Sequence, residues 1–174
     1  ARRAGARLTL ATNHCHRLED PWMDRAIAVK FNKLGWSLDA LRGRAVDGIL
    51  AVGDAPALLA AEVGVAFGIP FHTPTAARAA QDNSLARTLL RGKVPVPRFF
   101  EAKTPDYADR AEYPCVLKPL GASASKGVIR ANDPAEFRAA FARIRKMRET
   151  RIQVESYIAG REFAVEAIAT NGRV

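Results

Sequence analysis

Three stretches in the first third of the chain have the apolar pattern of β-strands. Residues 7–12 alternate apolar and polar positions and include β-branched side chains, and residues 26–29 are apolar throughout. Residues 46–52 form a largely continuous apolar run, which is typical of a parallel strand that is covered on both faces. The pattern predicts three strands here.

Helical periodicity occupies the intervals between these stretches. Leu34, Leu38 and Leu41 recur at spacings of four and three, which predicts a short helix. A second helix is expected to begin at Asp54 as N-cap, run to about residue 67 and end at Gly68. Strand and helix alternating over about 60 residues predict a small parallel α/β unit.

Helices and a change in composition follow this unit. Thr73-Pro74 marks a new helix start, and a further helix containing Leu85 and Leu89 is expected to stop at Gly92. Four prolines then punctuate residues 95–114. We place the domain boundary between about residues 71 and 96, which gives two domains, 1–80 and 81–174.

The second half reads as strands around one amphipathic helix. Strands are expected at 113–119, 128–130, 151–155 and 162–170, with a hairpin turn at Asn171-Gly172. Asp133-Pro-Ala-Glu136 predicts a capped helix start. The apolar stripe of that helix consists of Phe137, Ala140, Phe141 and Ile144. The expected fold class is α/β, a parallel-sheet domain followed by the first part of an α+β domain.

Composition narrows the class of protein. The 27 Lys and Arg against 18 Asp and Glu give a net charge of +9, but no nucleic-acid-binding signature accompanies them, and the densest cluster, over residues 138–148, fits a solvated helix face. No apolar run approaches the ~20 residues of a membrane span. Two cysteines 100 positions apart fit a reducing cytoplasm, and a signal peptide is not expected.

The most informative stretch is Val116-Leu-Lys-Pro119 with the loop Gly121 to Gly127 behind it. Lys118 ends an apolar strand, and two glycines, two serines and a second lysine follow within seven residues. Backbone N–H groups, hydroxyls and ammonium groups in such a loop can converge on a phosphate. A flexible hairpin loop with surface lysines is the alternative. The loop lacks the Walker A spacing.

Three segments together resemble the ATP-grasp superfamily of carboxylate–amine and carboxylate–thiol ligases. They are Lys118 with its loop, the segment Gln153-Val-Glu-Ser-Tyr-Ile-Ala-Gly-Arg-Glu-Phe163 and the Val94-Pro-Val-Pro97 strand. The likeness covers about residues 70–174. The first domain looks like the family's pre-ATP-grasp domain. Residues 12–22 look most like those of biotin-carboxylase-like ligases, and the family's L-amino-acid ligases are also similar.

The resemblance implies a nucleotide site. Lys118 matches the lysine that reaches the α- and β-phosphates of ATP, and Glu155 opens the adenine hinge. Glu162 matches the acid that binds the ribose hydroxyls. The remaining residues implied are Ser123, Ser125, Lys126 and Gly127 in the loop over the triphosphate, and Ser156, Tyr157 and Ile158, whose backbone would meet the adenine edge.

One position departs from the family. Asn83 stands where members carry a second phosphate-binding lysine, and Arg87 follows one turn later. Losing one charge-assisted contact would cost roughly 1.5–3 kcal/mol, unless Arg87 compensates. The catalytic residues and the magnesium ligands are expected beyond Val174, so we expect an inactive N-terminal fragment of a ligase, with no metal site of its own.

The implied function is an ATP- and Mg²⁺-dependent ligase that activates a carboxylate as an acyl phosphate for attack by an amine or another nucleophile. A nucleotide-binding regulatory module without catalysis is the alternative. The expected partners are ATP and a small-molecule carboxylate, without nucleic acid or membrane, and a homodimer is left open. His14-Cys15-His16 offers too few ligands for a convincing zinc site.

Overall fold

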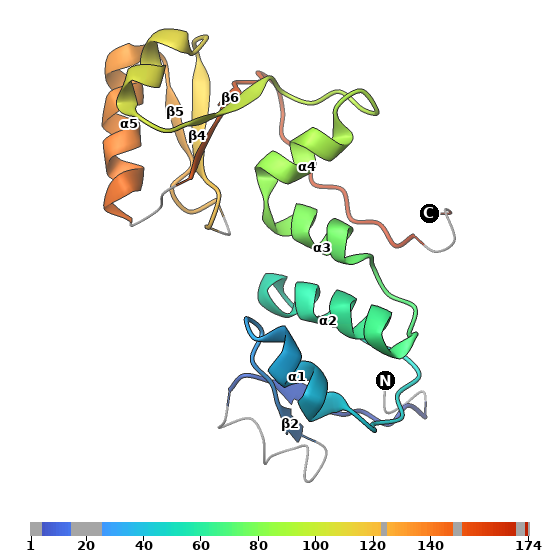
Figure 1. Ribbon diagram of the computed structural model, residues 1–174. Helices are drawn as coiled ribbons and strands as arrows, with labels where there is room; N and C mark the ends of the chain where they lie inside the picture. Colours follow the sequence, from blue (N-terminus) through green and yellow to red (C-terminus); the bar gives the residue numbers. More distant parts are fainter. Residues whose placement is uncertain (1–4, 15–25, 123–124, 148–150, 170–172, 174) are drawn as a thin grey trace. The chain divides into compact units, whose positions relative to one another are not determined.

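The chain divides into two compact units, Ala1–Leu89 and Leu90–Val174, in a computed structural model (Figure 1). The structure describes residues 5–14, 26–122, 125–147, 151–169 and 173. Each unit contains its own sheet, one parallel and one antiparallel. The expected fold class, a parallel α/β unit followed by an α+β unit, is confirmed. The exact domain limits of 1–80 and 81–174 stay a prediction.

The first unit has a two-stranded parallel sheet. Strand β1, Leu10–Thr12, pairs with β2, Ala26–Ala28, so that Leu10 lies opposite Ala26. The third expected strand is wrong, because residues 46–52 form no strand. Leu50 and Val52 are 87% and 82% exposed. The run has the composition of a buried strand, but it lacks the backbone pairing that makes one.

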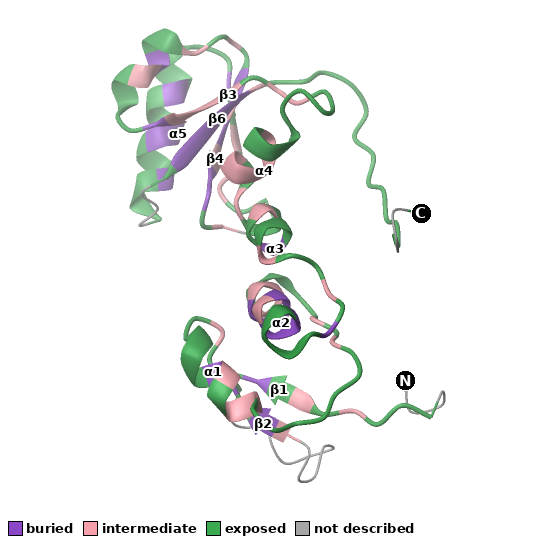
Figure 2. Cartoon of the chain, turned by 45° about the vertical axis from the view of Figure 1, so that its right-hand side comes forward, coloured by how far each residue is buried: buried purple, intermediate pink, exposed green. Residues whose placement is uncertain are grey.

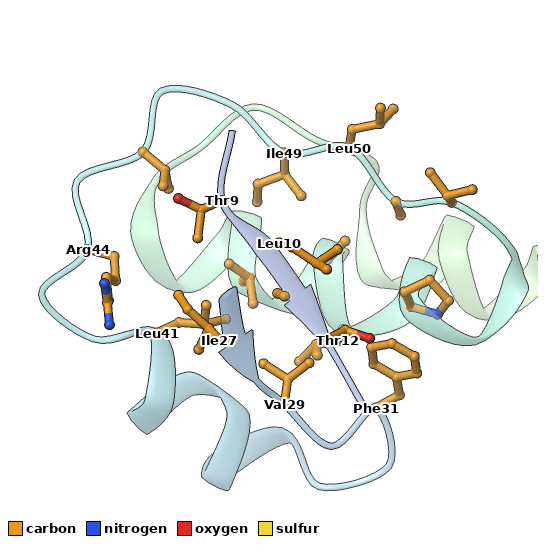
Figure 3. A pocket seen from close by; sticks show the side chains of 18 of the residues that line it. Thr9, Leu10, Thr12, Ile27, Val29, Phe31, Leu41, Arg44, Ile49 and Leu50 are labelled. Carbon is orange, nitrogen blue, oxygen red and sulfur yellow. The ribbon is translucent and has the colours of Figure 1, made fainter. Parts of the chain in front are cut away.

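A pocket of about 400 Å³ lies between β1 and this unpaired run (Figure 3). Leu10 and Ile27 approach it from the sheet and Ile49 from the run, while Arg44 stands at one end. Its lining is mainly aliphatic, with few polar groups to orient a ligand. None of the residues expected to bind nucleotide lines it. We therefore interpret it as the space left by the unpaired run.

Four helices complete the first unit. They are α1 (Leu34–Leu41), α2 (Asp54–Phe67), α3 (Pro74–Gln81) and α4 (Asn83–Leu90). Asp54 is the first helical residue rather than the cap, since Gly53 takes the cap position with φ 93°, a conformation that glycine adopts readily. Gly68 ends α2 in the left-handed conformation, as expected. Thr73 caps α3 by accepting a hydrogen bond from Ala76 N–H.

The second unit is a four-stranded antiparallel sheet with one long helix against it. Its elements are β3 (Phe99–Ala102), the 3₁₀ helix η4 (Pro105–Arg110), β4 (Cys115–Pro119), β5 (Ile129–Ala131), α5 (Pro134–Lys146) and β6 (Ile152–Ser156). The strand order is β3-β6-β4-β5. The strand expected at 94–97 begins only at Phe99, since prolines at 95 and 97 cannot donate to a sheet.

The core of this unit lies between α5 and one face of the sheet (Figure 2). The expected stripe of α5 is confirmed, as all four of its residues are buried. Asp133 caps the helix by accepting from Glu136 N–H. On the sheet, Cys115 and Leu117 of β4 and Ile152 and Val154 of β6 belong to the same cluster.

The last expected strand is not formed. Residues 161–169 are exposed and unpaired, and Phe163 and Ile168 point no side chain into a core. Their alternation satisfies the strand pattern, but no neighbouring strand offers them an edge in the described part of the chain. The expected turn at 171–172 lies outside the described residues. No helix in the described ranges is long and apolar enough to cross a membrane.

Candidate nucleotide site

Strand register places three polar side chains on the face of the second sheet that is turned away from α5. Lys118 lies opposite Gln153, and Val116 lies opposite Glu155. Cross-strand partners share a face, and side chains alternate between faces along a strand. Because Leu117 and Val154 pack in the α5 core, Lys118, Gln153 and Glu155 occupy the opposite face.

These three side chains form a hydrogen-bonded set. Lys118 Nζ donates to Glu155 Oε2 at 2.5 Å, and Gln153 Nε2 donates to Glu155 Oε1 at 2.6 Å. The side chains of Lys118 and Glu155 are 22% and 5% exposed, and Gln153 is fully buried. A buried carboxylate needs such partners, because an unpaired charge in this position would be strongly destabilising.

Gln153 was missed by the sequence analysis, although its place two residues before Glu155 was a usable signal. Alternation in a strand puts both side chains on one face. Gln153 Oε1 is buried and accepts no hydrogen bond from any residue in the described part of the chain. Buried polar atoms without a partner are rare and costly, so this oxygen stands out as an acceptor that could receive a hydrogen bond.

The loop from β4 to β5 begins two residues after Lys118. Val128 N–H donates to the Ser125 carbonyl at 3.2 Å, closing a turn in which Gly127 has φ 78°. A Cβ at Gly127 would approach Met147 Sδ to 3.0 Å, so glycine fits both the turn and the packing. Ser125 and Lys126 are exposed, and Ser123 lies outside the described residues.

The hinge after Glu155 uses two of its three N–H groups within the fold. Ser156 N–H donates to the Arg98 carbonyl, and Tyr157 N–H donates to the Pro114 carbonyl. The Ile158 N–H has no partner in the described part of the chain, and Ile158 is 70% exposed. The donor expected from residues 156–158 therefore narrows to Ile158.

The Ser156 carbonyl likewise accepts no hydrogen bond within the described ranges. Arg98 N–H, which faces it across the β3–β6 pair, donates instead to the Ser156 hydroxyl at 3.1 Å. No described residue donates to that carbonyl. In extended chain, groups two residues apart face the same edge. The hinge thus presents one acceptor, at Ser156, and one donor, at Ile158, to the same side.

The Tyr157 ring packs against the side chain of Arg130 of β5. The Arg130 guanidinium lies 4.1 Å from the ring centroid, and its Nε donates to Asn132 Oδ1. Asn132 in turn donates to Glu136 in the first turn of α5. A cation over an aromatic face is attractive, so this chain of contacts ties the hinge to α5.

The remaining expected site residues lie on other segments of the chain, and their part in a nucleotide site stays a prediction. Glu162 is exposed in the unpaired segment. Asn83 and Arg87 belong to α4 of the first unit, where Asp82 Oδ1 caps the helix by accepting from Ser84 and Leu85 N–H. Cys15 and His16 lie outside the described residues, which contain no cluster of three metal-binding side chains.

Comparison with known proteins bears on the second unit directly. Residues 111–174 match the family model of the ATP-grasp domain. The sequence gives no match among curated proteins. The expected resemblance to the ATP-grasp superfamily is confirmed by this match, which contains Lys118 and the whole hinge.

Solved structures share the fold of the chain. An L-amino acid ligase from Bacillus licheniformis aligns with TM-score 0.72 and 22% identity over 91% of this chain and 40% of its own. A biotin carboxylase from Campylobacter jejuni, in a complex with β,γ-ATP, gives 0.61 and 15% over 91% and 41%. A D-alanine–D-alanine ligase from Bacillus anthracis, complexed with ATP, gives 0.54 and 16% over 83% and 49%. The chain spans less than half the length of each.

Proposed function

We propose that this chain, which carries an ATP-grasp domain match over residues 111–174, forms the ATP-binding side of a ligase that activates a carboxylate. The observation that carries the proposal is the placement of Lys118 and Glu155 beside a hinge whose Ser156 carbonyl and Ile158 N–H have no partner among the described residues. Phosphate and purine could therefore be bound at the two ends of one short stretch of sheet.

The hinge matches the edge of adenine. The base offers an exocyclic amine as donor and a ring nitrogen as acceptor on neighbouring atoms. The Ser156 carbonyl can accept from the amine, and Ile158 N–H can donate to the ring nitrogen. The Ser156 carbonyl belongs to the last residue of β6, so little order has to be gained there on binding.

Lys118 suits the phosphate end. Its ammonium is a compact charge on a flexible stem, and it is partly exposed although its partner carboxylate is buried. Moving it from Glu155 to a phosphate would form a new charge-assisted hydrogen bond, while Glu155 would keep the hydrogen bond that Gln153 donates. Ser125, Lys126 and Gly127 would close over the triphosphate with further donors, and Glu162 would accept from the ribose.

The reaction we propose is acyl-phosphate formation. A substrate carboxylate oxygen attacks the γ-phosphorus, the bond to the β-phosphate oxygen breaks and ADP leaves; an amine or other nucleophile then displaces phosphate from the acyl carbon. Mg²⁺ would neutralise the transferring phosphoryl oxygens. The described residues contain no group of three His, Cys, Asp or Glu side chains that could hold it. The buried free thiol of Cys115 fits a reducing cytoplasm.

The role of the hinge can be tested by removing one hydrogen-bond donor, the backbone N–H of residue 158. Ile158→Pro deletes the free N–H and breaks no hydrogen bond of the described fold. We expect it to weaken ATP binding about tenfold in calorimetry. Ile168→Pro, the same change in the exposed unpaired segment, is the matched control and should bind ATP as the original chain does. Equal affinity of both variants, or no binding by the original chain at millimolar ATP, would overturn the proposal.

Catalysis is tested separately from binding. Release of ADP by the protein, screened with pooled carboxylates and amines, is expected to depend on one carboxylate. Tight ATP binding without any such release would instead favour the regulatory module.

A further inference from the structure

We propose that Gln153 recognises the 6-amino group of the purine, and that its Oε1 accepts a hydrogen bond from this group. The inference rests on the proposed nucleotide site and adds a determinant of base selectivity to it. The observation behind it is a buried amide whose oxygen has no partner, on the sheet face that carries Lys118 and Glu155.

The orientation of this amide is fixed by its neighbour. Gln153 Nε2 donates to Glu155 Oε1 at 2.6 Å, and a carboxylate can only accept. Turning the amide around would place its oxygen against the Glu155 oxygen. Oε1 is therefore held as an acceptor, and any ligand group that binds it must be a donor.

Among the parts of a nucleoside triphosphate, the base amine fits this acceptor best. Phosphate oxygens accept hydrogen bonds and would be repelled by it. A ribose hydroxyl could donate, but the Gln153 amide is drawn toward Glu155, which is the hinge end of β6. The hinge carbonyl of Ser156 follows directly, so the base edge is the group of the ligand placed nearest to Gln153.

In this proposal, movement of Lys118 gives the ligand access to Oε1. Lys118 is the direct cross-strand neighbour of Gln153 on the same face, and its ammonium is bonded to Glu155. Transfer of the ammonium to a phosphate would remove it from the polar set and open the space beside the amide. Recognition of the amine should then depend on the triphosphate.

The test compares ATP with the triphosphate of purine riboside, which lacks the amine, by calorimetry on the original chain and Gln153→Met. Methionine keeps the length of the side chain without the acceptor. We expect the original chain to prefer ATP, and the preference to fall about 3- to 10-fold in the variant. Loss of the bond to Glu155 would weaken both nucleotides alike and so leave the ratio unchanged.

Gln81→Met is the matched control, since Gln81 is exposed on α3; its ratio should equal that of the original chain. An unchanged ratio in Gln153→Met would overturn the inference while ATP binding upheld the proposed site. Binding of neither nucleotide by the original chain would overturn the proposed site itself.

A second measurement needs no variant. The original chain should discriminate adenosine from purine riboside less, by about 3-fold or more, than it discriminates the two triphosphates. Equal discrimination in both pairs would contradict the role given to Lys118.

Discussion

The apolar patterns of the two units predict strands equally clearly, yet more of the predicted strands are paired in the second unit than in the first. In the second unit, β4 is paired on both edges, by β6 and β5, and one face is closed by α5. In the first unit, β1 is paired with β2 alone, and the apolar run 46–52 remains exposed beside it. A strand is thus decided by its neighbours as much as by its own residues.

The largest expected effect concerns the packed core between α5 and the sheet of the second unit. Phe137→Ala empties the centre of the α5 core and should lower the free energy of unfolding by about 3–5 kcal/mol. Both tryptophans, Trp22 and Trp36, belong to the first unit. Chemical denaturation followed by circular dichroism should show the shift, while the tryptophan transition stays in place. A shift of both transitions together would mean that the units unfold as one.

The opposite face of the same sheet should be sensitive to the loss of a single charge. Lys118→Ala leaves the Glu155 carboxylate buried without its ammonium and should cost about 2 kcal/mol of stability. Adding Glu155→Gln to that variant should cost less than the two single effects combined, giving a coupling of at least about 1 kcal/mol.

The exposed pair Arg138–Asp109 serves as the control for that cycle. Its coupling should stay below about 0.5 kcal/mol. Similar couplings for the two pairs would argue that Lys118 and Glu155 do not form a buried ion pair.

A smaller effect is expected from pH. Burial raises the pKa of the Cys115 thiol from 9.0 to about 11. Between these values the folded chain keeps a proton that the unfolded chain has lost, so stability falls as the pH rises. Relative to Cys115→Ala, the original chain should lose about 1 kcal/mol between pH 8.5 and 10. Parallel pH profiles of the two proteins would show that Cys115 is not shielded by the sheet.

The smallest expected effect concerns the exposed run 46–52 of the first unit. Leu50→Asn should change the stability of the first unit by less than about 0.5 kcal/mol, because this side chain is almost fully exposed. The tryptophan transition is the measurement, and Leu59→Ala in the buried cluster of that unit is the control, expected to cost about 2 kcal/mol. A large loss in Leu50→Asn would place residues 46–52 in a third strand on β1.

Local signals predicted the helices well and the sheet edges poorly. Thr73, Gly68 and Asp133 act as expected, since a cap depends on residues three or four positions away. Residues 46–52 and 162–170 have strand patterns too, but pairing depends on segments that lie far away in sequence. No local pattern reports whether such a partner is present.

The residues of the candidate site also fall into those that the sequence could predict and those that depend on strand pairing. Lys118 and Glu155 could be named from the family resemblance, and the structure brings them together. Gln153 required the register of β4 against β6, which pairs it with Lys118. The unpaired groups of the hinge depend on how Arg98 meets Ser156 across two strands 58 residues apart, which no sequence spacing reveals.

That last contact sets where the second sheet stops. The Arg98 N–H donates to the Ser156 hydroxyl instead of to the Ser156 main-chain carbonyl. The ladder of hydrogen bonds between β3 and β6 therefore lacks its last backbone bond at this end. With alanine at this position, the Arg98 amide would turn to the main-chain oxygen and lengthen the sheet. One side-chain oxygen therefore leaves the Ser156 main-chain carbonyl available as an acceptor, which an additional pair of the sheet would otherwise use.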